Sequence, residues 1–185
     1  MHRLIKSMAA IAVLGGGAAI GGSVAMASTP ISGSVQVWAT IPNNGNSGTF
    51  PVLLTGAVGD YGNALNANAS GQVVKGQKDG YKLFVLKHGS ILLNGKNLNA
   101  ALNNPNTPPT TQNNTTCSAT FVVTEPVPVV KGTKAYAGIT GSITVTVSFA
   151  ELGPKNKNGS CNESNNAKPV STYGSVTGTG SVSYG

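Results

Sequence analysis

Apolar and polar side chains alternate along several short stretches of this chain. The clearest stretch runs from Ser142 to Phe149, where every second residue is apolar and hydroxyl residues stand between. Successive side chains of a strand point to opposite faces of a sheet, so this alternation predicts a half-buried strand. Its apolar face comprises Ile143, Val145, Val147 and Phe149, and its polar face comprises Thr144, Thr146 and Ser148.

Similar alternation predicts strands at three other places and a glycine-rich strand at the end of the chain. From Tyr173 to Tyr184, small residues stand between Val176 and Val182, and glycines inside a strand indicate close packing or a strong bend. The other predicted apolar faces are Val35, Val37, Ala39 and Ile41; Tyr81, Leu83 and Val85; and Cys117, Ala119, Phe121 and Val123.

Segments rich in Gly, Pro and Asn separate these runs and predict loops. The segment from Ser90 to Leu102 is ambiguous, because Asn94-Gly95 favours a tight hairpin while its leucines fit either a strand or a short helix. About six to nine strands predict an all-β fold, a single antiparallel β-barrel of about eight strands, with a β-sandwich as the alternative. The predicted loops run from Pro42 to Gly48, Asn63 to Gly71, Asn103 to Thr116 and Pro154 to Lys168.

The first 27 residues have the pattern of a secretory signal peptide. Arg3 and Lys6 precede an apolar run, and Ala25-Met26-Ala27 predicts cleavage between Ala27 and Ser28. A membrane anchor is the alternative, but glycines interrupt the run and a span needs about 20 apolar residues. We therefore expect a secreted, extracellular protein with no transmembrane span, in which residues 28–185 form one barrel domain.

The charge of residues 28–185 argues against a nucleic-acid partner. This part has ten scattered lysines, five acids and no arginine, which gives a net charge of +5. Arginine is the preferred side chain for reading phosphates and guanine edges, so its absence excludes the usual sequence-specific readers. We interpret the charge as solubility, although a mildly cationic protein would also be retained by an acidic cell envelope.

Cys117 and Cys161 are the two cysteines of the chain, and we expect them to form a disulfide outside the cell. The bridge would close a loop of about 45 residues, which is worth roughly 4 kcal/mol in the chain-entropy model. A metal site is the alternative. Together with His88, however, the two cysteines lack the spacing of a zinc motif, so no metal is expected.

The inventory of reactive side chains predicts no catalytic residue and no cofactor. His88 is the one histidine after residue 27, and no nucleophile elbow surrounds it, so we expect a surface histidine at a strand end. Glu125 and Glu151 form no recognisable carboxylate pair, and no phosphate-binding glycine loop is present. Asp60 lies between glycines and is expected to be a turn residue that bonds to its own backbone.

The aromatic residues are few, and Trp38 and the tyrosines allow two interpretations. On a surface they would suit a carbohydrate-binding platform. At strand spacing they are more often core residues or barrel plugs, and we expect the latter here.

Short glycine motifs carry a resemblance to known barrels. The segment Gly132-Thr-Lys-Ala-Tyr-Ala-Gly-Ile-Thr-Gly141 resembles a motif of the allene oxide cyclase and dirigent group of eight-stranded barrels. The order of Gly59–Gly62, Thr115–Cys117 and Cys161–Asn166 is also similar to small secreted actinobacterial proteins of unknown function. The resemblance implies an apolar cavity open at one end, although the acidic and arginine groups of dirigent sites have no equivalent beyond Asp60 and Asp79.

We therefore expect a secreted, non-enzymatic barrel that binds a small hydrophobic ligand or a partner in the cell envelope. A cyclase or isomerase that acts on a hydrophobic substrate is the alternative. The pattern names no ligand-binding residue and no oligomeric state. We expect the apolar face that includes Val145 to form a packed core rather than to line a cavity.

Overall fold

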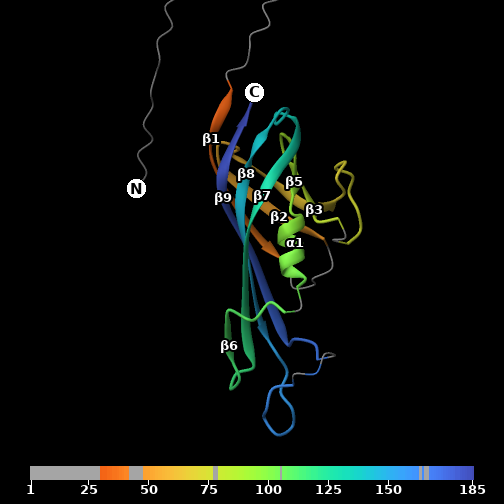
Figure 1. Cartoon of the computed structure of the whole chain (residues 1–185), viewed down its shortest axis with the longest axis vertical. Coiled ribbons are helices and arrows are strands. Elements are labelled where there is room, and N and C mark those ends of the chain that lie inside the picture. Colours follow the sequence, from red (N-terminus) through yellow and green to blue (C-terminus); the bar gives the residue numbers. More distant parts are fainter. Residues whose placement is uncertain (1–29, 42–47, 77–78, 105, 163, 165–166) are drawn as a thin grey trace, which may run out of the picture.

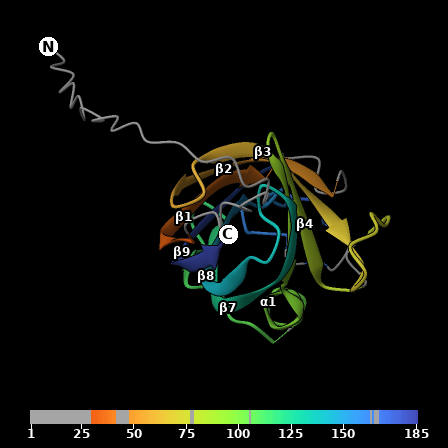
Figure 2. The ribbon, with the colours of Figure 1, turned by 90° about the horizontal axis from the view of Figure 1, so that it is seen from above.

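Eight antiparallel strands follow one another around a closed barrel in the computed structural model, which describes residues 30–41, 48–76, 79–104, 106–162, 164 and 167–185 (Figure 1). β1 pairs with both β2 and β9, and β5 pairs with β7, so the sheet has no open edge around the barrel. The ring of strands is visible from above (Figure 2). The strands are β1 Ile31–Ile41, β2 Thr49–Gly56, β3 Asp60–Ala67, β4 Tyr81–Leu86, β5 Gly89–Asn94, β7 Ser118–Lys134, β8 Thr140–Leu152 and β9 Ser171–Tyr184.

This architecture confirms the predicted all-β class and the eight-stranded barrel over the sandwich. The proposed signal segment, residues 1–27, lies outside the described residues, as does its cleavage site at Ala27 and Ser28. Most of the predicted loop from Pro42 to Gly48 lies outside them as well. The predicted loop that begins at Asn63 is wrong over its first part, because β3 continues to Ala67 and pairs with β4.

The ambiguous segment from Ser90 to Leu102 divides into a strand and a helix. β5 ends at Asn94, Gly95 caps the next element, and α1 covers Lys96–Leu102. Leu98 and Leu102 are four positions apart and therefore share one helical face, which packs against the barrel core. In the described parts of the chain, no helix is long and apolar enough to cross a membrane.

The interior faces of β1 and β8 agree with the alternation of the sequence. Val35, Val37, Ile143 and Val145 are all buried. In β4 the predicted face is wrong, since the inward set is Lys82, Phe84 and Leu86, while Val85 is exposed. Both alternate sets of this strand are largely apolar, so its pattern did not distinguish inside from outside.

Glycines let β9 lie unusually close to its neighbours, as its composition predicted. A Cβ atom on Gly180 would stand 2.1 Å from the backbone oxygen of Ser142, and one on Gly178 would stand 2.9 Å from Cγ2 of Ile143. Neither distance is possible without a shift of the sheet. The glycines therefore allow the tight pairing of β8 and β9 inside the barrel wall.

Three strands continue beyond the barrel as an extension (Figure 1). It is made of the first part of β7, the last part of β8 and the first part of β9, and β6 (Thr111–Asn113) pairs with its β7 edge. Cys117 precedes β7 and Cys161 lies between β8 and β9, and the two form the predicted disulfide with their Cα atoms 5.4 Å apart. The bridge lies in the extension, away from the barrel core.

Candidate functional site

One end of the barrel is closed by a buried tyrosine. Tyr136 lies in the turn between β7 and β8, is 2% exposed, and donates a hydrogen bond of 2.6 Å to Oδ2 of Asp60. The ring of Tyr184 packs edge-on against it, with 5.5 Å between ring centroids, and its hydroxyl donates to the carbonyl of Ala57 at 2.7 Å. We call Asp60, Tyr136 and Tyr184 the closing cluster.

The closing cluster joins the two glycine motifs of the sequence, Gly59–Gly62 and Gly132–Gly141. Gly132, at the start of the longer motif, would place a Cβ atom 2.1 Å from the carbonyl oxygen of Tyr136, so only glycine lets the turn fold inward. Asp60 belongs to the other motif, 76 positions earlier in the chain. The motifs thus seal one end of the barrel.

Asp60 does more than the turn residue that we predicted. Its carboxylate accepts a hydrogen bond from the adjacent backbone N–H of Tyr61 at 2.8 Å, as expected, but also one from the N–H of His88 at 3.0 Å. It is the first residue of β3 and is buried. The expected bond to its own backbone is confirmed, but the flanking glycines do not reveal that Asp60 begins β3 and that its side chain points into the barrel.

Burial by itself raises the pKa of Asp60, but the hydrogen bonds from Tyr136, His88 and Tyr61 outweigh it and hold the pKa below its usual value. Burial and the neighbouring carboxylate of Asp60 raise the pKa of the Tyr136 hydroxyl, so Tyr136 remains a donor across the ordinary pH range. The cluster therefore combines an ionised carboxylate with a neutral phenol.

Asp60→Asn is expected to lower the free energy of unfolding by about 1.5–3 kcal/mol at neutral pH, the usual worth of a hydrogen bond to a charged group. A group whose folded pKa is lowered stabilises the protein above its unfolded pKa and loses that effect as the pH falls through the folded pKa. The difference between the two proteins should be constant above about pH 5 and shrink below about pH 4. Urea denaturation across this range measures it, and a difference independent of pH would contradict the assignment.

His88 is a surface residue at the turn between β4 and β5, as predicted. Its side chain is 60% exposed, and Nδ1 lies 3.3 Å from Oδ2 of Asp60. The nearby hydroxyl of Ser90 shares a hydrogen bond of 2.8 Å with the hydroxyl of Thr133 instead of facing the imidazole. The imidazole of His88 therefore lies beside a buried carboxylate at a strand end, and the geometry does not align a nucleophile with a base.

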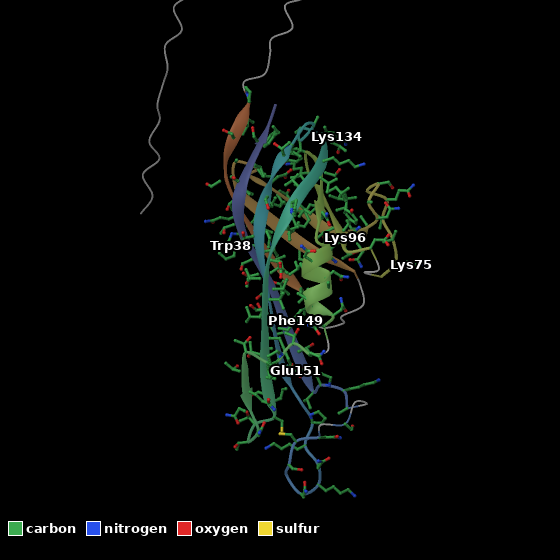
Figure 3. The ribbon with its side chains drawn as sticks, viewed as in Figure 1. Trp38, Lys75, Lys96, Lys134, Phe149 and Glu151 are labelled. Atoms are coloured by element: carbon green, nitrogen blue, oxygen red, sulfur yellow. A yellow bond between two sulfur atoms is a disulfide. The ribbon has the colours of Figure 1, made fainter. Side chains whose placement is uncertain are left out.

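The other end of the barrel holds a cavity of about 290 Å³ beside α1. Val145 belongs to the buried core, as expected, and it also borders this cavity. Figure 3 labels Phe149, which lies just below α1 where the extension leaves the barrel. Apolar side chains from seven strands and α1 dominate the lining, and they include Ala39, Phe50, Leu98, Leu102, Val145 and Phe149.

Lys82 and Asn66 form a polar pair in the wall of this cavity. Nζ of Lys82 donates a hydrogen bond to Oδ1 of the buried Asn66 and lies 5.5 Å from the centroid of the Phe50 ring. Burial lowers the pKa of Lys82 to about 8, because the ammonium loses water without gaining an anion. Among the described residues, the one ion pair within 4.0 Å joins His88 and Asp60, at the other end.

Sequence reasoning missed Lys82 and Asn66. The available signal was the position of Lys82, which alternates with Phe84 and Leu86 along β4 and therefore shares their inward face. This position indicates an inward side chain only when the inward face of β4 is already known. Asn66 gave no signal, because it falls in the segment predicted as a loop.

The outer surface carries aromatic residues that we expected in the core. Trp38 is paired with Leu53, and Leu53 with Tyr61, so the three form a row across β1, β2 and β3. They are 48%, 47% and 59% exposed, and Figure 3 shows Trp38 on the outside of the barrel. Tyr173 on β9 is also exposed. The expectation of core residues is correct for Tyr136 and Tyr184 and wrong for Trp38, Tyr61 and Tyr173. Outward-facing residues of a strand also recur at every second position, so their spacing does not distinguish them from core residues.

Comparison with protein-family models, with curated proteins and with solved structures finds no match to this chain. The structure shares the eight-stranded antiparallel barrel with the allene oxide cyclase and dirigent group, and the comparisons identify no family. Within the described residues, no three histidine, cysteine, aspartate or glutamate side chains gather in one place.

Proposed function

We propose that this protein is a non-enzymatic binding protein that holds a small hydrophobic molecule in the barrel cavity. The observation that carries the proposal is the partly open apolar cavity beside α1, lined by side chains of the barrel wall. Its volume of about 290 Å³ is at the lower end of the range of small-molecule sites, roughly 300–1,000 Å³. The guest is therefore a compact molecule.

The distribution of reactive groups favours binding over a cyclase or isomerase reaction. Asp60 and His88 lie at the closed end, outside the lining of the cavity. The polar pair in the cavity wall, Lys82 and Asn66, bond to each other. Acid–base catalysis needs groups aimed at a common point on the substrate, whereas this arrangement offers a polar anchor in an apolar wall.

We also propose that the protein is secreted. The pattern of residues 1–27 supports export, and a disulfide between Cys117 and Cys161 suits an oxidising compartment. A partner in the cell envelope is the second role, supported by the net positive charge of residues 28–185 and by the exposed row of Trp38, Leu53 and Tyr61.

The purified protein is expected to bind the neutral fluorescent probe N-phenyl-1-naphthylamine, and Val145→Trp should abolish the binding. Val145 is buried in the cavity lining, so the indole would occupy the space of the guest without adding charge. If the space is empty, the stability should change by less than about 1 kcal/mol. In a packed core the same change costs about 1–3 kcal/mol. Fluorescence titration and thermal melts measure both.

Thr144→Trp is the matched control, since Thr144 directly precedes Val145 in β8 and is exposed on the outer face. This variant adds the same side chain outside the barrel and should leave probe binding unchanged. If Val145→Trp binds the probe as tightly as the natural protein, the cavity is not the binding site and the proposal is wrong.

A further inference from the structure

Lys82 places its ammonium in the wall of an apolar cavity, and no acidic side chain of the described residues lies within 4.0 Å of it. The residues that touch its ammonium are an amide, Asn66, and an aromatic ring, Phe50, and both are neutral. An ammonium in such surroundings is costly, because amides and rings replace only part of its hydration. An apolar side chain at this inward position of β4 would avoid that cost.

Asn66 fixes the position of the Lys82 ammonium but does not accept all of its hydrogen bonds. An ammonium has three N–H donors, and the hydrogen bond to Oδ1 of Asn66 uses one of them. Asn66 is itself buried in β3, next to β4 in the barrel wall, so the direction of the Lys82 side chain is set by the sheet. The remaining donors are available to an acceptor that enters the cavity.

We propose that the ligand of this cavity is a small apolar monocarboxylic acid, whose carboxylate pairs with the ammonium of Lys82 while its apolar part lies among Val145, Leu98 and Phe149. This inference rests on the proposed function and adds the chemical class of the ligand. A single lysine without an arginine matches one negative charge rather than a phosphate dianion. The cavity of about 290 Å³ limits the apolar part to a short chain or a single ring system.

Isothermal titration at pH 7 with octanoate and with 1-octanol tests the inference, because the two ligands share an alkyl chain and differ in the charged head group. The natural protein should bind octanoate about 10- to 100-fold more tightly than 1-octanol, the range expected for a charge-assisted hydrogen bond. Lys82→Met should remove this preference. Its melting temperature should stay close to that of the natural protein, because the smaller desolvation cost of an apolar side chain at this half-buried position offsets the loss of the hydrogen bond to Oδ1 of Asn66.

Two further variants separate charge from packing. Lys82→Gln keeps a polar group without the charge and should also lose the preference for octanoate. Lys87→Met removes an exposed lysine one position beyond the same strand and should keep it. Binding of N-phenyl-1-naphthylamine should persist in Lys87→Met, because Lys87 lies outside the cavity lining.

The outcomes distinguish a wrong ligand class from a wrong proposed function. If the neutral probe binds but octanoate has no advantage, or keeps its advantage in Lys82→Met, the head-group assignment is overturned and the cavity remains a binding site. If neither the probe nor either ligand binds to the natural protein, both the ligand class and the proposed function are overturned.

Discussion

Tyr136→Ala is expected to lower the free energy of unfolding by about 3–5 kcal/mol, the usual cost of removing a large aromatic ring from a core. The ring is buried at the closed end of the barrel and packs against Tyr184. The change also leaves the carboxylate of Asp60 with one donor fewer in a buried position. The closing cluster is thus expected to be among the most sensitive points of the fold.

Urea denaturation with two further variants divides this effect into its parts. Tyr136→Phe keeps the ring and loses the hydroxyl, so it should cost about 1.5–3 kcal/mol. Tyr173→Ala removes an exposed tyrosine from β9 and should change the stability by no more than about 0.5 kcal/mol. If Tyr136→Ala were no worse than Tyr173→Ala, the cluster would not contribute to the core.

Replacing both cysteines by serine is expected to lower the free energy of unfolding by up to about 4 kcal/mol. The bridge between Cys117 and Cys161 spans 44 positions, and opening such a loop increases the freedom of the unfolded chain. Mass spectrometry of protein collected outside the cells of an expressing host should show the oxidised form, about 2 Da lighter than the dithiol. Free thiols in exported material would contradict the predicted compartment.

The location of the bridge predicts that its loss leaves the barrel intact. It joins the turn before β7 to the loop after β8, in the extension, whereas the cavity lies beside α1. Binding of N-phenyl-1-naphthylamine should therefore survive the double substitution, and hydrogen exchange should accelerate mainly in the extension. An unchanged melting temperature would show that the bridge does not limit the unfolded chain as the entropy model requires.

Much of the barrel could be predicted from the sequence because a strand alternates its side chains between two faces. Where one alternate set is apolar and the other polar, as from Ser142 to Phe149, both the strand and its inward face are determined. The same holds for the strand that contains Val35 and Val37. The disulfide was predictable as well, since two cysteines in a chain that begins with the pattern of a signal peptide allow one intramolecular pairing.

The pattern failed where both alternate sets are alike or where the decisive contact is distant. In β4 the apolar residues occupy both sets, so only the pairing with β3 and β5 decided that Lys82 faces inward. Asp60 and Tyr136 meet because the barrel brings the start of β3 next to the turn between β7 and β8, and no local pattern encodes such a contact.

The cavity is the feature that depended most on the tertiary structure. Alternation shows which side chains point inward, but not whether together they fill the space that the closed sheet encloses. Tyr136 and Tyr184 fill the interior at one end, whereas α1 covers the other end without filling it. The sequence by itself thus determined five of the strands, the disulfide and the class of fold. Only the closure of the barrel decided that Lys82 and Asn66 border an apolar cavity.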